Sequence, residues 1–184
     1  MSQPTHMFNL KDLRSPDLDI IQGLPHTVQS SPERKMAGVS VGTPLLLEDM
    51  VFPAFITVLA ALHLGTIARR VGLQRIKLKI SLPNTTGDPT FERTFRAHQN
   101  CSEFFPIFLS VLWVSAIFFH PGLASLVGVG YMFFRENYFN GYRRSPKERL
   151  PGFIGSSICL FVLVGTGLLG VLTLALRRYG NTDP

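Results

Sequence analysis

The sequence predicts an all-α integral membrane protein, built as a bundle of four helices. Its hydrophobic residues, 46% of the chain, gather in charge-free blocks. The blocks are Val51–Ala68, 104–130 and 152–176, which have 18, 27 and 25 residues. A helix of about 20 residues crosses a hydrocarbon core of about 30 Å. These lengths therefore fit membrane spans better than the core helices of a water-soluble domain.

The blocks divide into four expected spans, near 51–69, 103–119, 122–139 and 152–176. The middle block divides in two because His120-Pro-Gly122 is a turn signal close to its centre. The third span is the weakest, since it ends in Arg135, Glu136 and Asn137. Together the spans define a membrane domain over 51–176.

Alternating connections differ in charge. The connections 51–103 and 131–151 hold most of the chain's 18 lysines and arginines, whereas the turn at 120–122 holds none. By the positive-inside rule the two basic connections are cytoplasmic and both termini lie on the other side. A nucleic-acid partner is disfavoured, because the basic residues flank apolar spans and form no separate basic domain.

The segments outside the spans predict little structure. Residues 1–50 contain five scattered prolines and no sustained periodicity, which indicates a mostly disordered tail. Residues 177–184 form a short C-terminal tail. The first apolar run begins at 51, so we expect it to act as an uncleaved signal anchor. Cys101 and Cys159 are too few for a disulfide scaffold, and no Cys/His cluster has the spacing of metal ligands.

Capping signals mark two helix starts. Thr90 is the expected N-cap of the second helix, although Arg93 occupies the place of the usual Glu. Ser145-x-x-Glu148 is a complete capping box for the fourth helix. Pro151 argues against that start, since it would then fall inside the helix. With either start, Arg149 lies at the helix entrance.

A polar stripe leads into the second span. Its members Arg93, Arg96, Asn100 and Glu103 are 3, 4 and 3 residues apart, so they share one helical face. Such groups are costly in lipid and should face protein, water or an anionic ligand.

A second polar group closes the third span. Tyr138 and Tyr142 are i, i+4 neighbours, with Arg135 before them and Arg149 after. Guanidinium groups bind carboxylates, a Glu binds an ammonium, and amide and phenol groups fix orientation. The combined groups suit a small molecule that carries carboxylates and an amine.

Two motifs carry a resemblance to a known family. One is Gly87-x-x-x-Phe-Glu-Arg-x-Phe-x-Ala-x-x-Asn-Cys101, continuing Ser-Glu-Phe-Phe-Pro-Ile-Phe-Leu109, and the other is Tyr138-Phe-x-Gly-Tyr142. They resemble the membrane-associated proteins of eicosanoid and glutathione metabolism (MAPEG). The likeness is strongest to the leukotriene-C synthase and type-two microsomal glutathione transferase branch. It covers about 51–176.

The resemblance implies a homotrimeric enzyme of the endoplasmic reticulum or nuclear envelope. It would conjugate glutathione, its co-substrate, to lipophilic electrophiles such as the leukotriene A epoxide, with peroxidase activity toward lipid hydroperoxides as an addition. Glutathione would bind between subunits near the cytoplasmic end, and Arg149 would be catalytic by stabilising the thiolate. The positions that match glutathione-binding ones are Arg75, Arg96, His98, Asn100, Glu103, Tyr138 and Tyr142.

The sequence departs from the family pattern at two positions, and the family also offers an alternative function. His98 stands where an amide is usual, and Ile76 replaces a second arginine of the synthases, which favours a broader transferase. The alternative is a non-catalytic lipid-presenting scaffold, like the five-lipoxygenase-activating protein of this family. That relative lacks the arginine matched by Arg149, so its presence here favours an enzyme. A plain structural four-span protein would bind no glutathione.

Overall fold

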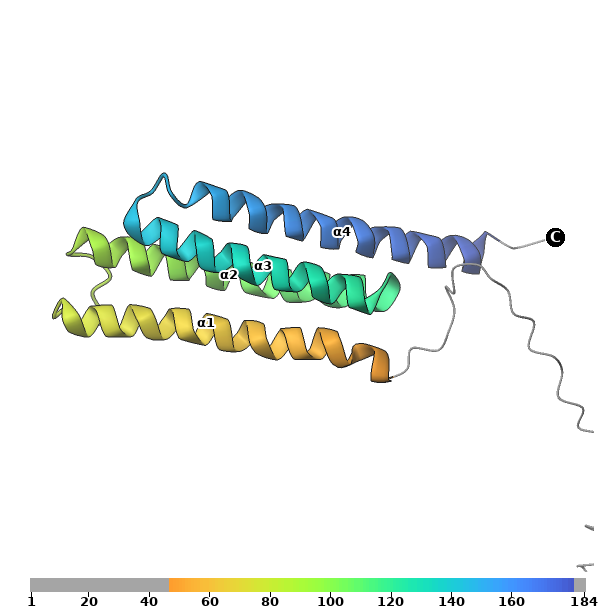
Figure 1. The fold of residues 1–184 in the computed structure, drawn as a ribbon, viewed down its shortest axis with the longest axis horizontal. Helices are drawn as coiled ribbons and strands as arrows, with labels where there is room; N and C mark the ends of the chain where they lie inside the picture. The colour runs from red at the N-terminus through yellow and green to blue at the C-terminus, as the bar shows by residue number, and fades with distance from the viewer. Residues whose placement is uncertain (1–46, 181–184) are drawn as a thin grey trace, which may run out of the picture. The chain divides into compact units, whose positions relative to one another are not determined.

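Four long helices lie side by side in the part of the chain that the structure, a computed structural model, describes, residues 47–180 (Figure 1). A short 3-10 helix, η3 (Leu47–Met50), leads into α1. The long helices are α1 (Val51–Lys77), α2 (Pro89–Phe118), α3 (Pro121–Arg144) and α4 (Leu150–Tyr179). Within this range there is no strand, so the predicted all-α bundle is confirmed. Most of the expected N-terminal tail lies outside the described residues.

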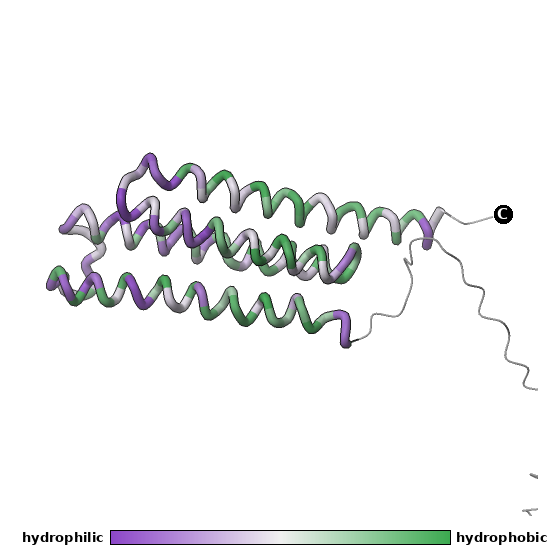
Figure 2. The backbone as a smooth tube through the Cα atoms, viewed as in Figure 1, coloured by the Kyte–Doolittle hydropathy of each residue, from purple (hydrophilic) through white to green (hydrophobic). Residues whose placement is uncertain are grey.

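By length and composition, three of the four long helices are able to cross a membrane. They are α1 together with η3, α2, and α4. The third helix is less apolar because Arg135, Glu136 and Asn137 lie in its second half. The connections α1–α2 and α3–α4 lie at the same end of the bundle. Polar residues gather at that end, whereas apolar residues cover most of the remaining helix length (Figure 2).

The core forms between α1, α2, α3 and α4. Phe108 and Leu112 of α2 are fully buried and pack with Ile56 of α1 and Leu163 of α4. The ring of Phe108 stacks on that of Tyr131, with centroids 4.1 Å apart. Apolar packing at this depth fixes the register of α2 against α3. It therefore also fixes the relative heights of the polar groups near the end of the bundle that carries the α1–α2 and α3–α4 connections, which we call the basic end.

The start of α2 differs from the prediction. Asp88, not Thr90, is the N-cap: its carboxylate accepts hydrogen bonds from the backbone N–H groups of Thr90 (2.7 Å) and Phe91 (3.1 Å). Pro89 then occupies the first helical turn, where its missing N–H costs nothing. Glu92 accepts a hydrogen bond from the N–H of Gly87, which has a φ of 137°. A glycine suits that backbone conformation, so the Gly-Asp-Pro sequence sets where α2 begins.

Replacing Asp88 by alanine should lower the unfolding temperature, and the loss should depend on pH. The N–H groups of Phe91 and Thr90 lower the pKa of Asp88 below its ordinary value. A carboxylate with a lowered pKa stabilises the fold at neutral pH and loses that effect as the pH falls below about 4. Thermal unfolding of both proteins at pH 7 and in acid measures this. A difference that stays constant between the two pH values would contradict the capping role.

The structure decides between the two starts that the sequence left open for the fourth helix. Helix α4 begins at Leu150 with Arg149 as its N-cap, and Pro151 lies in the first turn. Ser145 instead ends α3, and the Glu148 carboxylate accepts a hydrogen bond from Arg144 Nε at 2.6 Å. Starting the helix at 150 avoids a proline in its interior, which is the conflict that the sequence contained. The expectation that Arg149 lies at the helix entrance is confirmed.

Candidate functional site

A polar cavity of about 250 Å³ lies at the basic end of the bundle. Helices α2 and α3 and the entrance of α4 supply its walls. It contains six residues that the sequence analysis singled out and one that it did not. The lining residues are Arg96, Gln99, Asn100, Glu103, Tyr138, Tyr142 and Arg149.

One wall is the exposed face of α2. Arg96, Asn100 and Glu103 are one helical turn apart, so the predicted stripe does converge on a cavity. Gln99 belongs to the same wall and was missed, although its position three residues after Arg96 satisfies the same spacing rule. Arg93 is not part of the cavity. Its Nε donates to the carbonyl of Arg143 at 3.2 Å, which ties α2 to the end of α3.

The tyrosine pair of α3 forms the second wall. The ring centroids of Tyr138 and Tyr142 are 5.8 Å apart. Tyr138 is 3% exposed, and its ring lies 6.2 Å from that of Phe153 on α4. Packing on both sides fixes the position of the Tyr138 ring, so its hydroxyl can act as a placed hydrogen-bonding group.

Arg149 completes the cavity from the entrance of α4. Its guanidinium carbon lies 4.9 Å from the ring centroid of Tyr142, a cation–π contact. Residue 149 is also the N-cap of α4, where unsatisfied backbone N–H groups favour negative charge. A permanent cation and a helix N-terminus therefore favour an anion at the same place.

Arg135 lies behind the α2 wall. The sequence places it beside the tyrosine pair, but it was not among the predicted glutathione-binding residues. Its side chain is buried, with NH1 donating to Asn100 Oδ1 at 3.0 Å and Nε donating to the Tyr131 hydroxyl at 3.0 Å. Its guanidinium carbon is 4.4 Å from the Phe104 ring centroid. Because the Asn100 oxygen is engaged by Arg135, the amide N–H groups of Asn100 are the ones left for a ligand.

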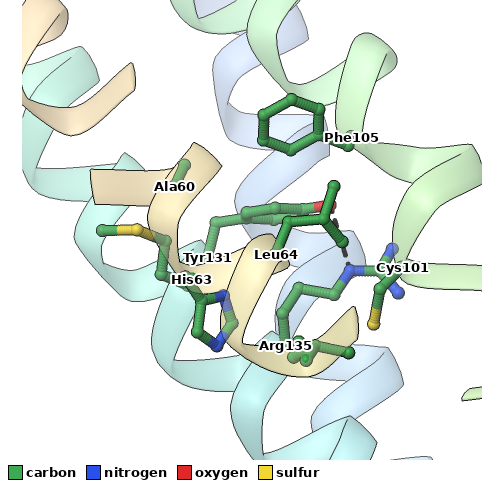
Figure 3. A pocket seen from close by; sticks show the side chains of 9 residues that line it. Ala60, His63, Leu64, Cys101, Phe105, Tyr131 and Arg135 are labelled. Atoms are coloured by element: carbon green, nitrogen blue, oxygen red, sulfur yellow. Dashed lines mark hydrogen bonds between the residues drawn. The ribbon is translucent and has the colours of Figure 1, made fainter. Parts of the chain in front are cut away.

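A second, small cavity lies beside Arg135 (Figure 3). It has a volume of about 20 Å³ and is lined by residues that include His63, Cys101, Tyr131 and Arg135. A volume near that of one water molecule excludes a substrate. Cys101 is buried here, as expected for a small apolar residue.

Two predicted residues lie outside the 250 Å³ cavity. Arg75 donates to the carbonyls of Asn84 (2.6 Å) and Ser81 (3.4 Å), and its guanidinium lies over the Phe91 ring. His98 lies 3.4 Å from the Ser102 hydroxyl on its own helix. Ile76, next to Arg75, is 76% exposed. Within one subunit these residues do not meet Arg149.

Most of the chain is similar in sequence to proteins of one known family. The profile described as the MAPEG family matches residues 51–169. Leukotriene C4 synthase of Bos taurus is 43% identical over 125 residues, which is 68% of this chain and 83% of that protein. The Rattus norvegicus leukotriene C4 synthase is 44% identical over the same shares. Microsomal glutathione S-transferase 2 of Homo sapiens is 40% identical over 131 residues, which is 71% of this chain and 89% of the relative.

Proposed function

This chain belongs to the MAPEG family, and from that premise we propose that it is a membrane-bound glutathione transferase. One observation carries the proposal: the cavity lined by α2, α3 and Arg149 gathers side chains from both sequence motifs at the entrance of α4. Relatives named for leukotriene C4 synthesis and for glutathione transfer support the same reaction class.

The lining groups match the chemistry of glutathione. Arg96 and Gln99 are donors suited to a carboxylate, and Glu103 is suited to the ammonium group. The Asn100 amide and the tyrosine hydroxyls would orient the peptide. The sulfur would lie at Arg149, where the fixed positive charge favours thiolate over thiol. A free thiol has a pKa of about 8.5, so little of it is nucleophilic at neutral pH without such help.

The reaction follows from an activated sulfur. The thiolate attacks an electrophilic carbon, and in an epoxide the new C–S bond forms as a C–O bond breaks. The oxygen then takes up a proton. Ile76 supplies no proton donor, so we propose a broad range of lipophilic electrophiles, the leukotriene A epoxide among them. With a lipid hydroperoxide the thiolate would instead attack the outer oxygen. The O–O bond breaks, the lipid alkoxide takes up a proton to become an alcohol, and a second glutathione converts the glutathione sulfenic acid to the disulfide and water. The substrates would enter from the bilayer of the endoplasmic reticulum or nuclear envelope.

A homotrimer would bring to the site the two predicted residues, Arg75 and His98, that do not line the cavity within one subunit. Arg96 and Glu103 are exposed side chains, so the cavity has an open side that a neighbouring subunit would cover. We propose that Arg75, and His98 with it, reach glutathione across that interface. Cross-linking of the purified protein in lipid measures the oligomeric state.

The decisive assay is glutathione-dependent turnover by the purified full-length protein in lipid. The leukotriene A epoxide and a generic aromatic electrophile should both be conjugated, and the generic substrate should be accepted at a comparable rate. Tight fatty-acid binding without conjugation would instead support a lipid-presenting scaffold. Absence of glutathione binding would overturn both this proposal and its site.

Replacing Arg135 by methionine should weaken glutathione binding without removing the chemistry. The substitution keeps an apolar stem but releases the Asn100 amide, which Arg135 NH1 holds at 3.0 Å. We expect the KM for glutathione to rise about tenfold, in line with the loss of one charge-assisted hydrogen bond, while kcat changes less. Steady-state kinetics with varied glutathione separates the two. A fall in kcat of about tenfold with an unchanged KM would contradict a positioning role for Arg135.

A further inference from the structure

A larger cavity, of about 450 Å³, lies at the same end of the bundle and shares no lining residue with the candidate glutathione site. It is formed by the last turns of α1, the start of α2 and the end of α3. One α1 face contributes Arg70, Gln74 and Lys77, which are one helical turn apart. Arg143 of α3 and Asp88 and Thr90 of α2 also line it.

Its charge is predominantly positive. Arg70, Lys77 and Arg143 line it against one carboxylate, Asp88, whose oxygen already accepts two backbone hydrogen bonds. Arg70 is paired, with NH1 2.6 Å from Glu136 Oε1. Lys77 is exposed and has no ion pair or side-chain hydrogen bond within residues 47–180.

Among the described residues, two side chains that line the cavity have N–H donors without an acceptor. Arg143 Nε is buried and has no hydrogen-bond partner in the described part of the chain. A buried donor without a partner is costly and calls for an acceptor. Gln74 Oε1 accepts from the Thr94 hydroxyl at 2.8 Å, and the NH₂ group of the same amide has no acceptor within residues 47–180. Cations and amide donors together suit an anion rich in oxygen acceptors.

The location selects the kind of anion. The residues that line the cavity come from the helix ends where polar residues gather along the backbone (Figure 2). Leu73, 55% exposed, and Leu78 also line it, so an apolar surface adjoins the cations. Basic pockets between membrane helices on the cytoplasmic side are suited to phosphorylated lipid headgroups. We propose that this cavity binds the phosphate monoester of an anionic membrane lipid, with Lys77 and Arg143 as its principal contacts.

Binding to the purified full-length protein in detergent tests the proposal. The probes are a short-chain phosphatidylinositol phosphate, the free inositol phosphate headgroup, inorganic phosphate and short-chain phosphatidylcholine. The pocket variant is Lys77→Gln with Arg143→Gln. The matched control, Lys79→Gln with Lys147→Gln, removes the same charge at the same end but touches neither cavity. Lys77→Gln alone is the second test variant. Lys77 is an exposed side chain, so its replacement should leave the fold intact even if the double variant misfolds.

The phosphorylated lipid should bind and phosphatidylcholine should not. Each lysine or arginine near a membrane surface adds about fivefold to such binding, so the pocket variant should lose about 25-fold and Lys77→Gln about fivefold. The control pair should change the affinity by less than about twofold, and glutathione conjugation should stay unchanged in all variants. If the free headgroup binds as tightly as the lipid, the ligand of this cavity would be a soluble phosphate ester and not a membrane lipid. Equal losses in the pocket and control pairs would overturn the proposal.

Discussion

Replacing Arg149 by alanine should lower kcat/KM for conjugation about 100-fold at pH 7. The guanidinium is the only cation at the entrance of α4 that lines the candidate site in the described residues. A tenfold change in the thiolate population corresponds to about 1.4 kcal/mol. The loss of one placed electrostatic contact in a catalytic site typically lowers kcat about 100-fold or more. The thiolate absorbance of bound glutathione should fall together with the rate.

The pH dependence separates this role from a structural one. Without Arg149, bound glutathione should ionise near the ordinary pKa of a thiol, about 8.5. The rate of the variant should therefore rise about tenfold per pH unit from pH 6 to pH 8, while the wild-type rate stays flat. Arg144→Ala is the matched control, since Arg144 is a neighbouring exposed arginine that pairs with Glu148 and does not line the cavity. Parallel pH profiles for wild type and Arg149→Ala would remove Arg149 from thiolate formation.

The sequence was sufficient for the parts of the fold that depend on regular spacing. Charge-free blocks predicted the bundle, and the stripe of Arg96, Asn100 and Glu103 predicted one wall of the cavity. Helical periodicity alone carries this information, because residues three and four apart share a face whatever the packing. Gln99 obeys the same rule and could have been included.

Features that depend on long-range packing were not predictable in the same way. Arg135 contacts Asn100 across α2 and α3, 35 positions apart in the chain, and no local pattern signals that pair. The start of α2 was mispredicted and the start of α4 was left open, because two local signals competed at each. At α2 the N-cap is Asp88, followed by Pro89, and not Thr90. At α4 the steric demand of Pro151 prevents the helix from starting at the Ser145 capping box. In both cases the start observed places the proline in the first turn.

The second large effect is expected from Gly152, where α4 crosses α3 beside the candidate site. A Cβ at this position would overlap the backbone nitrogen of Tyr138. Because the obstacle is backbone and not the end of a flexible side chain, Gly152→Ala must push the start of α4 away from α3. Arg149 lies three residues earlier and would move with it, away from the ring of Tyr142.

We expect Gly152→Ala to reduce conjugation about 100-fold, since a displacement near 1 Å in a catalytic site can cost that much. Overpacking typically also costs about 1–3 kcal/mol of stability, so the unfolding temperature should fall. Gly165→Ala is the matched control on the same helix, because a Cβ there meets nothing within 4 Å and alanine favours a helix. Glutathione should still bind to Gly152→Ala through the α2 wall, while its thiolate absorbance should fall. If the two alanine variants behaved alike, the close approach of α4 to Tyr138 would not be what places Arg149 at the sulfur.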